Sequence, residues 1–318
     1  MASSADMKPL RHRNQKRWQL PVTQLIACLV ILAGTGVFLY PQVASWFSQK
    51  EQSRVTALAQ ERLNRPPLNE PETVNEQLER AHEYNDALAS GAIYRANENM
   101  ATGDGTLDDD TYDYGEILDL AGGGFMGRLR YDALAIDLPI YHGTSDEVLN
   151  KGVGHLEGTS LPVGGISTRS VLTAHRGLPS ATLFNDLNKA AVGDIFTVSV
   201  LDQVLSYQVI ETFVIEPDET EAIFADPERD LITLVTCTPL GINSHRILVT
   251  AERITPTPQD QVVAATEAPN LPGFPWWTVI LGGVVAGLSV YIWKSGYQTP
   301  AARKNDASRA EDADVLSD

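Results

Sequence analysis

Two long uncharged segments constrain the fold of this chain more than any other feature. The first, Leu20 to Tyr40 (LPVTQLIACLVILAGTGVFLY), carries no charge over about 21 residues, which is enough to cross the roughly 30 Å of hydrocarbon in a bilayer. The second, Phe274 to Trp293 (FPWWTVILGGVVAGLSVYIW), is also uncharged and has tryptophans near both ends, as aromatic side chains favour the membrane interface. We therefore predict transmembrane helices at residues 20–40 and 274–293.

Basic side chains outside the two segments predict their orientation. Lys8, Arg11, Arg13, Lys16 and Arg17 precede the first segment, and Lys294, Arg303 and Lys304 follow the second. Because cytoplasmic flanks carry an excess of Lys and Arg, we expect residues 1–19 and 294–318 to be cytoplasmic tails and the region between the spans to be exported. Alternatively, the first segment is a cleaved signal peptide, since Val43-Ala44-Ser45 resembles a small-residue cleavage site. In both cases the second segment holds the exported region at the membrane.

Charge and cysteine content narrow the class of protein. The formal net charge of −17 and the lack of a basic stripe in the exported region argue against a nucleic-acid partner. Cys28 lies inside the first apolar segment and Cys237 lies outside the membrane, so the two cannot pair within one chain. A single exported thiol indicates a reactive nucleophile or an intermolecular bridge. The structural alternative is a buried, inert cysteine.

The predicted secondary structure of the exported region changes near residue 111, from helices and a loop to strands. Residues 41–111 include two predicted helices, SRVTALAQERL and TVNEQLERAHEYNDALASG, the second with a capping box of Thr73 and Glu76 and a stop at Gly91. Its apolar stripe is thin, so we expect these helices to lie against something larger. A loop rich in Gly and Asp follows them.

Residues 112–255 contain the strand signals. Short runs rich in Val, Ile, Thr and Tyr alternate with Gly, Pro, Asn and Asp, without a regular alternation of strands and helices. This pattern predicts a mainly antiparallel sheet of seven or eight strands, closed into a barrel or folded into a two-sheet sandwich. Residues 256–273 contain several Pro and Thr residues and are predicted to be a linker to the membrane.

Three chemically useful residues lie at predicted strand ends. Cys237 ends the strand DLITLVTC, His175 ends the strand SVLTAH, and Arg246 opens the strand RILVTAERI. Strand ends before loops are where a sheet presents side chains to a groove, so the three residues are predicted to share one rim.

The three residue types suit acyl transfer through a thioester. Only a thiolate attacks a carbonyl well, and a nearby cation favours the thiolate of Cys237. His175 can return a proton to a leaving amine, and Arg246 can hold a peptide carbonyl and the oxyanion that forms from it. We find no H-x-x-x-H or C-x-x-C spacing, so no metal site is predicted.

Other candidates for these roles have structural explanations. His82 is predicted to be solvated on a polar helix, and His142 and His155 are predicted to pin Gly-rich turns. Side-chain alternation turns His245 and Arg176 away from the face of their neighbours Arg246 and His175. A lone histidine in a strand is nevertheless more often structural than catalytic, so spacing alone leaves both interpretations open.

Several motifs, in order, resemble the sortases, which are membrane-anchored cysteine transpeptidases of Gram-positive bacteria. TLVTC is followed nine residues later by an arginine, LTAHRG lies upstream, and LPIYHGTSDEVLNKGVGHLEGTSLPVGG spans residues 138–165. The resemblance covers about residues 124–254 and is closer to the pilus-building class C sortases than to the housekeeping ones. A second membrane helix at the C-terminal end points the same way.

The resemblance implies a closed eight-stranded β-barrel with an N-terminal helical segment and two flanking transmembrane helices. It also implies that Cys237 attacks the Thr–Gly bond of an LPxTG-like sorting signal on a pilin, that His175 acts as acid and base, and that Arg246 binds the oxyanion or the signal backbone. A pilin lysine then resolves the thioester as an isopeptide bond, without a cofactor. Two alternatives are a sortase that anchors surface proteins to peptidoglycan and a non-catalytic surface scaffold or adhesin.

Class C sortases often carry a lid loop with an Asp-Pro-aromatic motif before the barrel. The stretch GDGTLDDDTYDYGEIL lacks this tripeptide. Asp110 and Tyr112 are the residues that could stand in for it, with the carboxylate near Arg246 and the ring over Cys237. The alternative is an acidic loop without this role.

Overall fold

The structure is a computed structural model that describes residues 18–89 and 113–297. The chain divides into two compact units, one formed by residues 1–40 with 275–318 and the other by residues 41–274.

The first unit contains the two apolar segments. Helix α1 (Val22–Leu63) begins here and continues into the second unit, and helix α5 (Trp276–Ser295) has no buried residue. Both helices are long and apolar enough to cross a membrane, judged by length and composition. Large side chains such as Val37 and Phe38 are 78% and 74% exposed, which is unusual for a helix surrounded by water. These findings agree with the predicted spans, while their orientation stays a prediction.

Helix α2 (Pro71–Ala89) shows where the helix prediction was right and where it was wrong. The helix starts at Pro71, which is favoured in a first turn because the missing N–H has no partner there. Thr73 therefore lies inside the first turn, and the predicted capping box is wrong. The expectation that the helix lies against something larger is confirmed, because Tyr84 and Ala81 are fully buried in the main core. The predicted stop at Gly91 lies outside the described residues.

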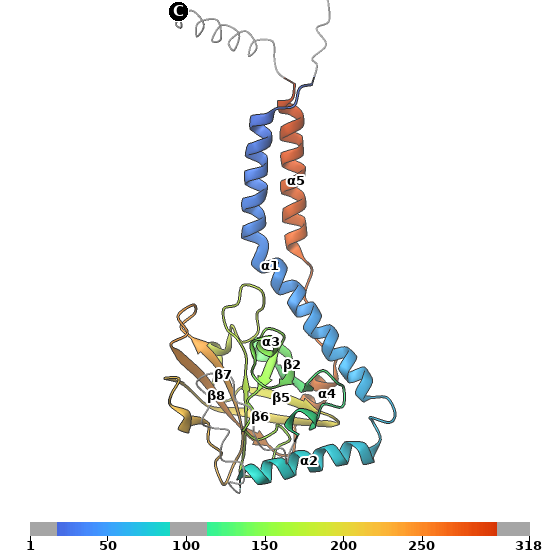
Figure 1. Cartoon of the computed structure of the whole chain (residues 1–318), viewed down its shortest axis with the longest axis vertical. Coiled ribbons are helices and arrows are strands. Elements are labelled where there is room, and N and C mark those ends of the chain that lie inside the picture. The colour runs from blue at the N-terminus through green and yellow to red at the C-terminus, as the bar shows by residue number, and fades with distance from the viewer. Residues whose placement is uncertain (1–17, 90–112, 298–318) are drawn as a thin grey trace, which may run out of the picture. The chain divides into compact units, whose positions relative to one another are not determined.

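Eight strands form a closed barrel (Figure 1). The strands are β1 (Phe125–Tyr131), β2 (Ile136–His142), β3 (Val153–His155), β4 (Thr168–Thr173), β5 (Ile195–Val200), β6 (Gln203–Ile215), β7 (Asp230–Thr238) and β8 (His245–Ile254). Their order is β1-β2-β3-β4-β7-β8-β6-β5, and β5 pairs with β1. The pairs β2–β3 and β4–β7 are parallel and the others are antiparallel. The prediction of a mainly antiparallel barrel is thus confirmed.

Short helical turns connect the strands. They are η2 (Tyr114–Glu116), η3 (Asp132–Leu134), α3 (Asp146–Leu149), η4 (Leu187–Lys189) and η5 (Thr220–Ile223). The turn η5 lies between β6 and β7, where its Ile223 is buried.

Side-chain alternation gives the strands an inner and an outer face. Leu172 on β4, Leu234 on β7 and Val249 on β8 belong to the main core, which includes residues of all eight strands and therefore fills the barrel. A separate group, here called the outer cluster, contains Val171, Ile223 and Leu248, with Val235 packed against it. Its strand members alternate with those of the core, so the cluster lies on the outer face of β4, β7 and β8.

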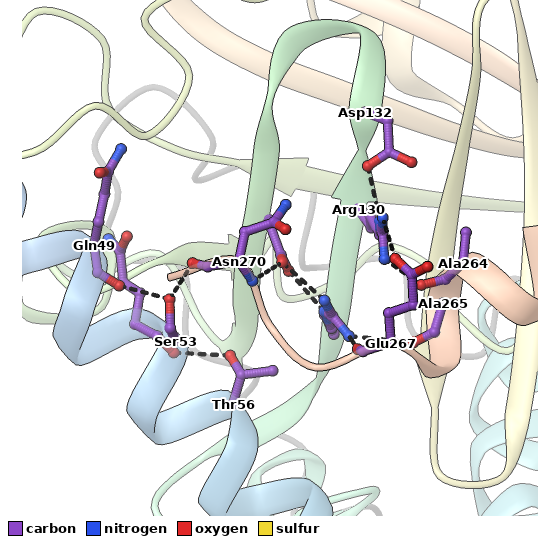
Figure 2. A network of polar contacts seen from close by, with 12 residues as sticks. Gln49, Ser53, Thr56, Arg130, Asp132, Ala264, Ala265, Glu267 and Asn270 are labelled. Atoms are coloured by element: carbon purple, nitrogen blue, oxygen red, sulfur yellow. Dashed lines mark hydrogen bonds and ion pairs between the residues drawn. The ribbon is translucent and has the colours of Figure 1, made fainter. Parts of the chain in front are cut away.

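The segment predicted as a linker contains helix α4 (Gln259–Thr266) and is bonded to the barrel. We call residues 255–273 the strap. Arg128 on β1 donates to the carbonyl oxygens of Ala265 at 3.1 Å and Glu267 at 2.8 Å. Figure 2 shows Arg130 between Asp132 and the strap, where it contacts the carbonyl oxygen of Ala264.

Further along, the strap joins β2 to the second part of α1. The backbone N–H of Asn270 donates to Asp137 Oδ2 at 2.7 Å, and its carbonyl accepts from Ser53 Oγ at 2.6 Å (Figure 2). The indole of Trp46 donates to the carbonyl of Gly273 at 2.8 Å. Within the second unit, these bonds make the strap part of the folded structure.

Candidate active site

Strand register places Cys237 and Arg246 next to each other. Cys237 is the penultimate residue of β7 and Arg246 is the second residue of β8. The two are direct partners in the antiparallel ladder. Both side chains are partly exposed, so a ligand in solvent can reach them.

The parallel pairing of β4 with β7 brings His175 to the same level. Thr173, the last residue of β4, pairs with Val235. The strand contact continues past this point, because Ala174 N donates to the carbonyl of Val235 at 3.2 Å and Thr236 Oγ1 donates to the carbonyl of Ala174 at 2.7 Å. Counting two residues onward from the Thr173 pair puts His175 level with Cys237. His175 thus lies two residues beyond the strand that it was predicted to end.

All three residues lie on the outer face by the same alternation. Cys237 is two residues after Val235, and Arg246 is two residues before Leu248, and both neighbours belong to the outer cluster. His175 follows Val171 by four residues, which is an even step in an extended chain. Register and alternation thus assign Cys237, Arg246 and His175 to one level and to one face at neighbouring strand ends.

The guanidinium of Arg246 is held by the turn between β7 and β8. Its Nη1 donates to the carbonyl oxygens of Asn243 at 2.9 Å and His245 at 3.1 Å. Arginine has five N–H donors in a fixed fork, so anchoring through one nitrogen fixes the direction of the others. The guanidinium of Arg246 is thus tied to the backbone beside its ladder partner Cys237.

His155 and His142 have structural roles. His155 is fully buried, with Nδ1 at 2.8 Å from the hydroxyl of Tyr114 and Nε2 at 2.9 Å from the carbonyl of Ser160. Burial lowers the pKa of His155 to about 3, so the ring is neutral at physiological pH. His142 contacts backbone carbonyls through both ring nitrogens, and His82 is exposed on α2. The pinning role predicted for His142 and His155 is confirmed, although both end strands rather than lie in turns.

Two remaining questions are the predicted lid residues and a metal site. Asp110 and Tyr112 lie outside the described residues. Within residues 18–89 and 113–297, no group of three or more His, Cys, Asp or Glu side chains is arranged to hold a metal ion.

Arg169 is a candidate binding residue that was not predicted from the sequence. It lies on β4 six residues before His175 and on the same face, beside a cavity of about 390 Å³ lined by Ser160, Ile223 and Phe224. Its Nη1 donates to Thr233 Oγ1 at 3.0 Å, and its Nε has no hydrogen-bond partner among the described residues. Burial lowers the pKa of the Arg169 guanidinium below its usual value. The one sequence signal for this residue is its even spacing from His175, which places both on the same face of β4.

Comparison with known proteins assigns the family. The family model for the sortase domain matches residues 129–254. Crystallised sortase C-1 of Actinomyces oris is 45% identical, with a TM-score of 0.52, over 58% of this chain and 99% of that one. Sortase C1 of GBS pilus island 1 is 37% identical, with a TM-score of 0.56, over 65% of this chain and 93% of that one. The chain therefore belongs to the sortase family.

The similarity to a curated relative is more distant. Sortase D of Bacillus subtilis is 27% identical over 136 residues, which are 42% of this chain and 66% of that protein. The match thus spans just under two thirds of this relative's length. The crystallised class C sortases resemble this chain over more of its length, and they confirm the barrel inferred from the motifs.

Proposed function

We propose that this chain is a cysteine transpeptidase that cleaves an LPxTG-like sorting signal and joins pilin subunits through lysine isopeptide bonds. The observation that carries the proposal is the shared level and face that register and alternation give His175, Cys237 and Arg246 at the ends of three adjacent strands. Similarity to a sortase named for a pilus island supports pilin as the substrate class.

The reaction follows from the three side chains. The Cys237 thiolate attacks the threonine carbonyl of the signal, and the bond to glycine breaks as the His175 imidazolium gives its proton to the leaving amine. A thioester remains on Cys237. A lysine amine of the next pilin attacks the thioester and gives a proton to the neutral imidazole. The C–S bond breaks, and the thiolate and imidazolium are restored.

Arg246 is proposed to stabilise the tetrahedral oxyanion in both steps. The charge develops on an oxygen beside Cys237, the ladder partner of Arg246, and a prepositioned donor costs little reorganisation at that moment. Losing one such donor costs about 3–4 kcal/mol of activation free energy, or roughly 10²–10³ in kcat.

We propose that one end of the signal binds near the cavity beside Arg169. The six residue steps from Arg169 to His175 span about 20 Å, at roughly 3.3 Å per step. A five-residue signal in extended form needs about 17 Å by the same measure. The two ends of the signal are therefore proposed to lie near Cys237 and near this cavity. Between them Val171 is 2% exposed and packed against Ile223 and Leu248, so the signal passes over the outer cluster and not along β4 itself.

The proposed location is the cell membrane, with the barrel outside and both termini in the cytoplasm. The two apolar helices and the basic tails support it. Under the alternative of a cleaved first segment, α5 alone anchors the barrel. Western blotting of the full chain with an N-terminal tag distinguishes the two, because cleavage removes the tag.

The test is an assay of the full chain in detergent with an LPxTG-type peptide, with Cys237→Ala as control. We expect cleavage by the wild type, a peptide thioester on Cys237 by intact mass spectrometry, and neither with Cys237→Ala. Cleavage that survives Cys237→Ala contradicts the mechanism. An accessible Cys237 that forms no adduct with a panel of sorting-signal peptides favours the non-catalytic scaffold.

The acceptor amine is tested separately. A pilin domain with its lysine should yield a covalent dimer that disappears in a lysine-to-arginine variant. Preference for the amine of a peptidoglycan cross-bridge instead supports the alternative of a sortase that anchors surface proteins.

A further inference from the structure

Arg176 directly follows His175 and bridges two segments of the barrel rim. Its Nε donates to the carbonyl of Asn185 at 3.0 Å, and its Nη1 donates to Thr238 Oγ1 at 3.1 Å. Thr238 directly follows Cys237. The bridge thus connects the residue after the histidine to the residue after the cysteine.

A second bond lies on the other side of the same pair. Thr236 Oγ1 donates to the carbonyl of Ala174 at 2.7 Å, so it connects the residues that precede Cys237 and His175. The two side-chain bonds therefore bracket the pair, one residue before and one residue after. By alternation Thr236 and Thr238 share the face opposite to Cys237, so the Arg176 bridge lies behind the reacting groups.

The bridge is anchored in a well-packed loop. Phe184 N donates to the carbonyl of His175 at 3.1 Å, and the Phe184 side chain is fully buried in the main core. Gly177 N donates to Asn185 Oδ1 at 2.6 Å. Gly177 has φ +82°, and a Cβ there would lie 2.6 Å from Leu240 Cδ2 in the turn between β7 and β8. The loop after His175 and the turn after Cys237 are thus packed against each other.

We infer that Arg176 and Thr238 form a clamp that fixes the separation of His175 from Cys237. The inference rests on the proposed function, because the separation matters only if the His175 proton must reach the amine that leaves the carbonyl attacked by Cys237. Proton transfer requires hydrogen-bond reach, and a misplacement of about 1 Å can cost roughly 10²-fold in rate. Arg176 and Thr238 are positioning residues, since they act through their neighbours.

Three variants separate a clamp from a simple effect of charge. Arg176→Lys keeps the positive charge, but an ammonium cannot reproduce the planar fork that reaches both Asn185 and Thr238. Thr238→Val keeps the side-chain shape and removes the hydroxyl. Thr238→Ser keeps the hydroxyl. The matched control is Arg229→Lys, the same change at a partly exposed ion pair with Glu252.

The experiment uses the full chain in detergent and has two readouts. The first is kcat and KM for sorting-peptide cleavage. For Arg176→Lys and Thr238→Val, we expect kcat to fall about 10- to 100-fold with KM within about twofold. Thr238→Ser should recover kcat to within about threefold, and Arg229→Lys should match the wild type. Urea midpoints close to the wild-type value exclude loss of folding as the cause.

The second readout is the pH profile of Cys237 alkylation by iodoacetamide, which needs no peptide. In Arg176→Lys and Thr238→Val the profile should move toward that of His175→Ala. If the profile shifts in these variants but neither they nor the wild type cleave any peptide, the result supports the clamp and contradicts the proposed function. Wild-type profiles and kcat in both variants, or a Thr238→Ser variant as impaired as Thr238→Val, overturn the clamp.

Discussion

The buried ion pair of Arg128 and Asp137 is the contact whose loss should cost the most stability. Arg128 Nε and Nη2 donate to the two Asp137 oxygens at 2.6 and 2.8 Å, and the side chains are 1% and 4% exposed. Asp137→Asn leaves the guanidinium buried without a counter-charge and also disturbs the bond from Asn270 N. Breaking such a pair typically costs about 3–5 kcal/mol. We expect this loss in a urea titration followed by circular dichroism in mild detergent.

The double variant Arg128→Met/Asp137→Leu tests the reasoning. It leaves no lone charge, so its cost should be about 1–3 kcal/mol, from the hydrogen bonds to Ala265, Glu267 and Asn270 that are lost. The double variant should therefore be more stable than Asp137→Asn. An Asp137→Asn variant that loses less than about 1 kcal/mol refutes the argument, since it would mean that the pair is solvated.

Other predictions follow from single residues. Burial lowers the pKa of His155 to about 3, against an ordinary 6.5, so protonation favours the unfolded state. The free energy of unfolding should therefore fall by up to about 1.4 kcal/mol per pH unit as the pH drops from 6.5 toward 3. His155→Gln should reduce the dependence of the urea midpoint on pH between 6.5 and 3, and an unchanged dependence contradicts this role of His155. Gly177→Ala should lower Tm because the φ of +82° disfavours a residue with a Cβ, and an unchanged Tm contradicts this left-handed backbone conformation. Arg246→Gln should lower kcat about 10²–10³-fold with little change in Tm, so near-normal kcat argues against the oxyanion role.

Much of the site could be predicted because its signals are local. The strand ends at Cys237 and Arg246 follow from apolar runs and turn residues, and the antiparallel pairing follows from the short connection between the two strands. The level of His175 does not follow in this way. It depends on the parallel pairing of β4 with β7, which are separated by two other strands along the chain.

The strap was missed for a similar physical reason. Its Pro and Thr residues are typical of linkers, and most of the groups that hold it are backbone carbonyls and the Asn270 N–H, which leave no trace in a side-chain pattern. Their donors, Arg128 and Arg130, lie more than a hundred residues earlier on β1. Similarly, the Thr73 and Glu76 spacing fits a capping box, but Pro71 begins the helix two residues earlier.

The most direct test of the site geometry is a disulfide between two strand ends. His175 is inferred to lie level with Cys237 on the same face of adjacent strands. Strands lie about 4.8 Å apart, which brings the two Cα atoms within the range of a disulfide. His175→Cys in a Cys28→Ala background should therefore form an intramolecular disulfide with Cys237 under mild oxidation. Arg176→Cys, one residue further on the opposite face, should leave Cys237 free. Mass spectrometry should show this pattern, and a free Cys237 in His175→Cys together with a disulfide in Arg176→Cys would contradict the proposed register.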